Sequence, residues 1–199
     1  MSFPTKIYFD TEFTGLHKNT TLISLALVSQ NNQAFYIELT DYDRNQITSW
    51  LEENVLAKLG IDKINKDFIK SFSQFQYMKG SKSEILPKLK LWLDQFEKIE
   101  IWSDCLSYDW VLFNDLFGTA LDIPKNISYI PLDICTKFHD NGIDPDITRE
   151  EFVSELLNKT KHDAKHTALW DAYIIKLCNE KLDLIKGLDS DYIYKYKGF

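Results

Sequence analysis

Carboxylates follow an apolar run near the start of this sequence, and their spacing is its first chemical signal. Asp10 and Glu12 come one residue apart, directly after Ile7-Tyr8-Phe9. In an extended chain alternate side chains project to one face, so both carboxylates would point the same way. Adjacent carboxylates resist ionising together unless a cation lies between them, and Mg²⁺ or Mn²⁺ prefers oxygen ligands. A bare Asp-x-Glu is nevertheless more often a solvated strand end.

A second group of acidic residues follows another strand-like segment. Asp104 ends the segment that starts at Lys98, and Asp109 lies in the first turn of a helix expected over 107–117. Functional residues of open α/β sheets collect at such strand-to-helix corners. Asp109 could equally stabilise the positive helix N-terminus, with Ser107 as its cap. Asp104 is the competing choice for a metal ligand at this corner.

A third feature combines a histidine with an aspartate near the last helix. His166 and Asp171 are five residues apart, which does not place them on one face of a regular helix. They would converge if His166 lay at the helix entrance and Asp171 inside the helix. Such a histidine could act as a general base towards a water, while the aspartate serves as a metal ligand. Taken alone, His166 is more typical of a capping or surface histidine.

The elements that must position these residues are predicted from hydrophobic periodicity. Strands are expected at 6–10, 21–29 and 33–39, which would form an antiparallel meander. Helices at 43–59, 81–96, 107–117, 148–157 and 166–182 alternate with strands at 98–104 and 127–133. This order implies the α/β class, with one mixed sheet flanked by helices. No linker or repeat marks a boundary, so 1–199 is expected to be a single domain with 184–199 as a C-terminal tail.

Composition restricts the class of protein further. The 199 residues are 44% hydrophobic and 14% aromatic, which excludes disorder over most of the length. Lys and Arg total 23 against 30 Asp and Glu, and the net charge of -7 argues against coating of nucleic acid by bulk charge. Three separated cysteines predict neither a zinc site nor a disulfide framework. With no apolar segment of membrane-span length, we expect a cytoplasmic protein without a membrane partner.

Together and in this order, the motifs resemble the DEDDh exonucleases of the ribonuclease H-like superfamily, which include ribonuclease T and oligoribonuclease. Asp10-Thr11-Glu12-Phe13-Thr14-Gly15-Leu16 is close to the family's first motif, Asp-Thr-Glu-Thr-Thr-Gly-Leu. His166-Thr167-Ala168-Leu169-Trp170-Asp171 matches its last motif, His-x-Ala-x-x-Asp. The middle motif is looser, because Tyr108-Asp109 stands for Phe-Asp and the expected Asn is missing. The resemblance spans Tyr8 to about Leu177 and is nearest to small bacterial or phage-like exoribonucleases.

The resemblance implies a ribonuclease H-like fold and a metal-dependent 3′–5′ exonuclease with a single-stranded substrate. Such an enzyme would release nucleoside 5′-monophosphates and prefer RNA to DNA. It would use two Mg²⁺ or Mn²⁺ ions, with His166 as general base. The implied metal ligands are Asp10, Glu12, Asp109 and Asp171. The implied substrate contacts at the 3′ end are Phe13, Thr14, Gly15, Leu16 and Lys165. The alternatives are a DNA exonuclease of proofreading or repair type and a non-catalytic binding module on the same fold.

Aromatic residues elsewhere have several interpretations. The stretch 63–79 interleaves lysines with Phe68, Phe72, Phe75 and Tyr77, and could form a single-strand platform, a lid or a homodimer surface. The tryptophans at apolar-periodic positions are expected in the core. They are Trp50, Trp92, Trp102 and Trp170.

Overall fold

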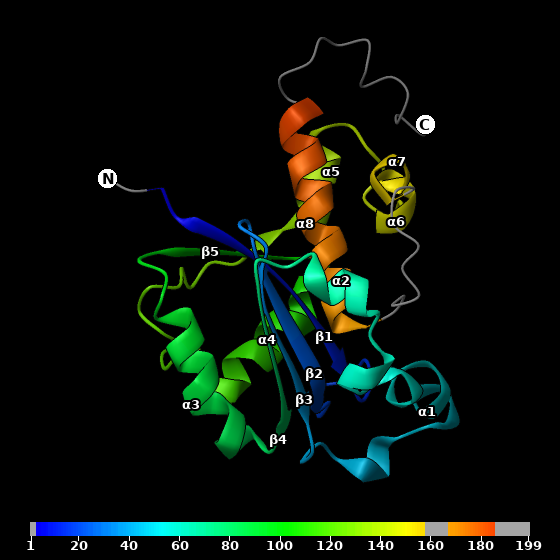
Figure 1. Cartoon of the computed structure of the whole chain (residues 1–199), viewed down its shortest axis with the longest axis vertical. Coiled ribbons are helices and arrows are strands. Elements are labelled where there is room, and N and C mark those ends of the chain that lie inside the picture. Colours follow the sequence, from blue (N-terminus) through cyan, green and yellow to red (C-terminus); the bar gives the residue numbers. More distant parts are fainter. Residues whose placement is uncertain (1–2, 158–166, 186–199) are drawn as a thin grey trace.

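A six-stranded mixed sheet forms the centre of the computed structural model, which describes residues 3–157 and 167–185 (Figure 1). The strand order is β4-β3-β2-β1-β5-β6. Neighbours pair antiparallel in β1–β2 and β2–β3 and parallel in the other three pairs. The strands are β1 (Thr5–Phe13), β2 (Leu22–Ser29), β3 (Gln33–Leu39), β4 (Gln74–Gly80), β5 (Ile99–Ser103) and β6 (Leu132–Asp133). The predicted antiparallel meander and α/β class are confirmed.

Helices cover both faces of this sheet, as Figure 1 shows. α8 packs along β1 and β2 on one face, whereas α3 and α4 cover the other. The helices are α1 (Ser49–Asn54), α2 (Lys66–Lys70), α3 (Lys82–Leu93), α4 (Leu106–Phe117), α5 (Ile134–Asp140), α6 (Arg149–Phe152), α7 (Ser154–Leu157) and α8 (Ala168–Ile185). Single 3₁₀ turns lie at Arg44–Gln46, Leu56–Lys58 and Ile61–Lys63. Across residues 3–157 and 167–185, no helix has the length and apolar character needed to span a membrane.

The alternation of side chains along β1 decides which way the acidic residues face. Tyr8 packs into the core beneath α8, and Phe9 packs into the core beneath α3 and α4. Because the period of a strand is two, Asp10 and Glu12 share the α8 side with Tyr8. Thr11 takes the opposite side, where it meets α4.

The predicted helix over 43–59 is wrong as a single element. Thr48 caps a new helix there, because its hydroxyl oxygen accepts a hydrogen bond from the backbone N–H of Leu51 at 3.3 Å. This restart turns Trp50 outward, and its side chain is 63% exposed. The expected core position of Trp50 is therefore wrong, whereas Trp92, Trp102 and Trp170 are buried as predicted.

The stretch 60–80 is more ordered than its sequence indicates. It contains α2 and the edge strand β4, which runs parallel to β3. Phe68 and Phe72 are buried in the core beneath α8. These two rings are packed against protein, so they cannot serve as an exposed stacking platform. Further on, the strand expected over 127–133 is limited to Leu132–Asp133, and α5 follows it without having been predicted.

Candidate active site

Asp10 lies where two groups of carboxylates meet. In one group, single carboxylate oxygens of Asp10, Glu12 and Asp171 all lie within 4.8 Å of one another. In the other, the same holds for Asp10, Asp104 and Asp109. Asp10 is 9% exposed and belongs to both groups. The fold therefore gathers five carboxylates into two adjoining clusters with one shared member.

Parallel pairing of β1 with β5 explains why residues 94 positions apart in sequence meet. Tyr8 is level with Trp102 in this pair, so Asp10 and Asp104 each lie two residues beyond a matched position. The carboxyl ends of parallel strands reach the same edge of a sheet, where α/β proteins place functional groups. Asp171 reaches this edge from the first turn of α8, whose contacts with β1 hold it over the strand.

Two hydroxyl groups hold the Asp109 carboxylate. Thr11 Oγ1 donates a hydrogen bond to Asp109 Oδ1 at 2.5 Å, and Ser103 Oγ donates one to Asp109 Oδ2. Asp109 itself is fully buried in the first turn of α4. The helix starts at Leu106 with Cys105 at the cap position, so the capping role considered for Ser107 is wrong. A buried carboxylate fixed by two neutral donors keeps a set orientation but gains no compensating charge.

Burial and mutual repulsion oppose ionisation throughout this cluster. Burial raises the pKa of Asp10 well above its usual range, and the carboxylates of Asp109 and Asp171 raise it further. Burial raises the pKa of Asp171 in the same direction, with Glu12 and Asp104 adding to the effect. Burial also raises the pKa of Glu12 to about 7 and that of Asp109 to about 7. Negative charge crowded in this way is the environment in which a cation binds most favourably.

The donor set fits hard divalent cations. All members of both clusters supply carboxylate oxygens, which Mg²⁺ and Mn²⁺ prefer over nitrogen and sulfur ligands. Within the described ranges, no side chain donates a hydrogen bond to the carboxylates of Asp10, Glu12 or Asp171. With no donor from residues 3–157 or 167–185, these oxygens can coordinate an ion.

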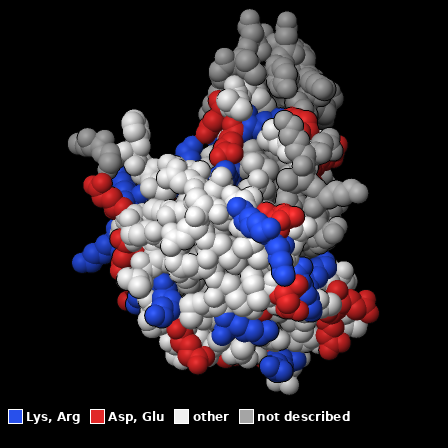
Figure 2. All heavy atoms as spheres, viewed as in Figure 1, with Lys and Arg blue, Asp and Glu red and all other residues white. Residues whose placement is uncertain are grey.

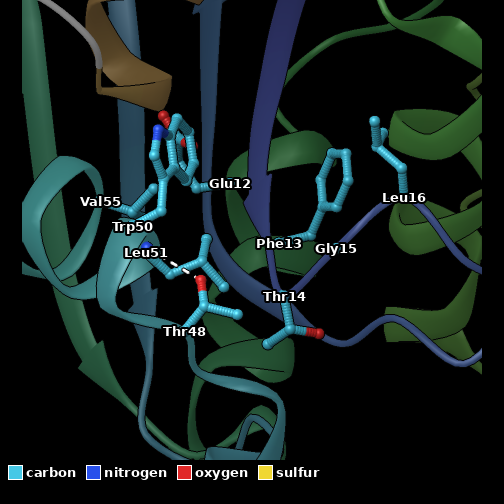
Figure 3. A pocket seen from close by; sticks show the side chains of 9 residues that line it. All are labelled: Glu12, Phe13, Thr14, Gly15, Leu16, Thr48, Trp50, Leu51 and Val55. Carbon is cyan, nitrogen blue, oxygen red and sulfur yellow. Dashed lines mark hydrogen bonds between the residues drawn. The ribbon is translucent and has the colours of Figure 1, made fainter.

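A cavity of about 390 Å³ adjoins Glu12 at the end of β1. In Figure 3, Thr48, Trp50, Leu51 and Val55 line one side of it, and Phe13, Gly15 and Leu16 line the other. Leu16 is 74% exposed and Trp50 is also exposed, so two large apolar side chains face solvent beside the acidic cluster. Exposed apolar side chains at a cavity rim are typical of ligand contacts.

Three predicted substrate contacts in this cavity already have protein partners. Thr14 Oγ1 donates a hydrogen bond to Gln46 Oε1 at 2.5 Å, and the backbone N–H of Gly15 donates to Thr20 Oγ1 at 3.0 Å. The Phe13 ring stacks on Tyr108, with 5.3 Å between centroids and 15° between planes. These contacts fix the shape of the turn after β1, and Leu16 presents the more accessible apolar surface.

The structure brings together some predicted residues and does not describe others. It places Asp10, Glu12 and Asp171 in one acidic cluster, and Asp10, Asp109 and Asp104 in the adjoining one. The predicted general base His166 and the basic residue Lys165 lie outside the described residues, as does almost all of the 184–199 tail. The sequence did not identify Trp50 as a residue of this site. Thr48 lies two positions before it, and a threonine that can cap a helix was a usable signal that a new helix starts there.

Charged side chains of both signs surround an uncharged area on one face of the molecule. On the face shown in Figure 2, Lys and Arg side chains alternate with Asp and Glu around a wide uncharged area. Proteins that coat nucleic acid instead carry a continuous basic stripe.

Comparisons with known proteins point to nucleases. No family model matches the chain. Two curated proteins named 3′–5′ exoribonuclease, from Mycobacterium tuberculosis strains CDC 1551 / Oshkosh and ATCC 25618 / H37Rv, are each 24% identical over 139 residues. The match covers 69% of this chain and 76% of each relative. These relatives confirm the resemblance to 3′–5′ exonucleases that the motifs indicate.

A solved structure is also similar in part. It is the catalytic unit of Neurospora crassa Pan2, which comprises protease and nuclease domains. The TM-score is 0.46 at 18% sequence identity, and the match covers 98% of this chain and 30% of that one.

Proposed function

We propose that the protein is a metal-dependent 3′–5′ exoribonuclease that releases nucleoside 5′-monophosphates from the 3′ end of single-stranded RNA. The observation that carries this proposal is the pair of carboxylate clusters that share Asp10. The similarity to two curated 3′–5′ exoribonucleases supports the reaction class. A pure binding module has no need to crowd five carboxylates together, since their repulsion opposes folding.

The carboxylates divide into two ligand sets in this mechanism. Glu12 and Asp171 would hold one divalent ion, and Asp109 would hold the other, with Asp10 shared between them. When bound, the two ions would stabilise the charge that develops on the phosphate and on the leaving 3′ oxygen. Thr11 and Ser103 would keep Asp109 oriented through their hydroxyl groups.

His166 would supply the general base. It precedes α8 by two residues, and Asp171 occupies the first turn of that helix. This proximity in sequence supports a role beside the Glu12 and Asp171 cluster. A neutral imidazole near physiological pH can take a proton from the attacking water and release it to solvent. Lys165 would contact a substrate phosphate from the same segment.

The cavity beside Glu12 would receive the terminal nucleotide. Trp50 and Leu16 offer exposed apolar surface on its two sides, and stacking on such side chains tolerates any base. A wall of this kind suits an exonuclease that removes nucleotides one after another without regard to sequence. The substrate would enter with its 3′ end first, which limits cleavage to the terminal phosphodiester bond.

The ladder of products formed from a labelled strand tests this function. Wild-type protein and Asp10→Asn would be incubated with 5′-labelled single-stranded RNA or DNA, in Mg²⁺, Mn²⁺ or EDTA. We expect a ladder shortening from the 3′ end of RNA that requires metal and is lost in the variant. A ladder on DNA alone would identify a DNA exonuclease. No digestion of either polymer would contradict an enzymatic role and favour a binding module.

A further inference from the structure

A largely buried arginine reaches the acidic cluster from α6, outside every motif considered above. Arg149 Nε lies 3.2 Å from Asp104 Oδ2, and the two side chains are 18% and 23% exposed. Among the described residues, this is the ion pair that reaches the cluster of Asp10, Asp104 and Asp109. Building on the metal-dependent function proposed above, we propose that Arg149 is a positioning residue that acts on the metal centre through Asp104.

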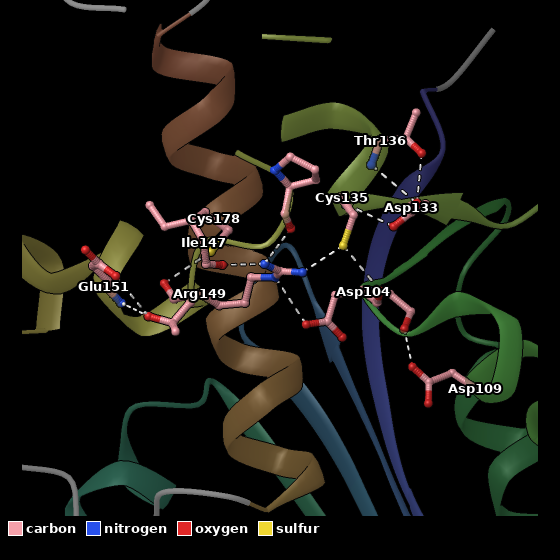
Figure 4. A network of polar contacts seen from close by, with 12 residues as sticks. Asp104, Asp109, Asp133, Cys135, Thr136, Ile147, Arg149, Glu151 and Cys178 are labelled. Carbon is pink, nitrogen blue, oxygen red and sulfur yellow. Dashed lines mark hydrogen bonds and ion pairs between the residues drawn. The ribbon is translucent and has the colours of Figure 1, made fainter. Parts of the chain in front are cut away.

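The guanidinium of Arg149 is fixed by several partners besides Asp104. Nη1 donates hydrogen bonds to the carbonyl oxygens of Ile147 at 2.5 Å and Pro145 at 3.1 Å. Nη2 donates to Cys135 Sγ at 2.7 Å. Figure 4 shows these contacts converging on one guanidinium, which also forms the ion pair with Asp104. The planar fork of arginine donors suits this many simultaneous bonds, which a lysine ammonium could not reproduce.

Contacts on the other side of Asp104 and on the face of the guanidinium complete the arrangement. Arg149 Cζ lies 5.3 Å from the centre of the Phe138 ring, and this contact favours the charged group electrostatically. Cys135 Sγ donates a weak hydrogen bond to the backbone carbonyl of Asp104 at 3.4 Å. Asp104 directly follows β5. Its backbone carbonyl is held by α5, and its side chain is held by α6.

Asp104 forms an ion pair with a cationic side chain, whereas Asp10 and Asp109 have no ion-pair partner among the described residues. Asp104 contributes an oxygen within 4.8 Å of oxygens from Asp10 and Asp109. Without a cationic partner, a third carboxylate at this place would be driven away or protonated. The Arg149 pair offsets part of this repulsion and holds the Asp104 carboxylate beside Asp10 and Asp109. Groups that orient metal ligands in this way typically change metal affinity by about 10–100-fold when removed.

A double-mutant cycle that measures Mn²⁺ binding tests whether Arg149 positions Asp104 or has a purely structural role. Mn²⁺ affinity would be measured by isothermal titration calorimetry, without RNA, for Arg149→Met, Asp104→Asn and the double variant. We expect each single variant to weaken binding of one ion at least about tenfold. The double variant should bind no more weakly than Asp104→Asn, because Arg149 then has no carboxylate to position. Arg44→Met, which changes the chain's other arginine on the exposed surface, should bind Mn²⁺ as the wild type does.

Two outcomes would overturn the inference. One is an unchanged Mn²⁺ affinity in Arg149→Met, even if its melting temperature falls. The other is a loss of affinity in Arg149→Met that persists in full in the Asp104→Asn background. If Arg149→Met does not fold, Arg149→Lys is measured in both backgrounds by the same criterion. Asp10→Asn separates this inference from the proposed function: if it binds Mn²⁺ as the wild type does, the metal centre itself is wrong.

Discussion

Glutamine in place of Glu12 should stabilise the metal-free protein at alkaline pH. Burial holds the pKa of Glu12 at about 7, against 4.5 in the unfolded chain. At about 1.36 kcal/mol for each pKa unit, ionising this group costs the folded state about 3 kcal/mol. The buried amide keeps part of the desolvation cost, so we expect Glu12→Gln to raise the free energy of unfolding by about 1–3 kcal/mol at pH 8.

The dependence on pH follows from the sign of this shift. The folded-state pKa is the higher one, so the penalty is absent below about pH 4.5 and complete above about pH 7. Wild-type stability should therefore fall as the pH rises through this window, and the advantage of Glu12→Gln should shrink to below about 1 kcal/mol at pH 5. Urea unfolding in EDTA, followed by circular dichroism at pH 5 and pH 8, measures both values.

A matched variant and added metal complete the test. Glu53→Gln removes the same charge from an exposed position on α1 and should change stability little at either pH. Mg²⁺ should stabilise the wild type more than Glu12→Gln, since an ion bound only by the folded state adds to its stability. Equal stability of Glu12→Gln and Glu53→Gln at pH 8 would refute the reasoning that the acidic cluster is strained without metal.

Three further predictions concern the proposed reaction. Trp50→Ala should raise KM for single-stranded RNA about tenfold in steady-state assays, because a stacking surface is lost, while its 63% exposure should leave the melting temperature nearly unchanged. Ser103→Ala should lower kcat about 10–100-fold in the same assay, because Asp109 loses one of its two hydroxyl donors. His166→Ala should lower kcat about 10²–10⁴-fold in single-turnover assays and retain Mn²⁺ binding, whereas His139→Ala, at an exposed position, should match the wild type.

The sheet and the first acidic pair could be predicted because they depend on local periodicity. Successive side chains of a strand alternate between its two faces. Tyr8 and Phe9 therefore enter different cores, and Asp10 and Glu12 face the same side. The choice between Asp104 and Asp109 could not be made in this way. It depends on the register of β1 against β5, and both aspartates turn out to lie beside Asp10.

Contacts between distant segments account for what was missed. Arg149 belongs to no motif, and its pairing with Asp104 exists only because α6 packs near the end of β5. Trp50 followed an apolar pattern that fitted one long helix, but the cap at Thr48 restarted the helix and changed the face that Trp50 occupies. Local capping can therefore override a periodic pattern and move a large side chain from the core to a cavity wall.

The positions of bound Mn²⁺ test the central claim most directly, because the whole account depends on two ions that share Asp10. Crystals grown with MnCl₂ would be measured by anomalous scattering at the manganese edge. We expect two peaks within coordination distance of Asp10, one also contacting Glu12 and Asp171 and the other also contacting Asp109. Ordered protein in saturating Mn²⁺ with no peak at Asp10 would contradict it.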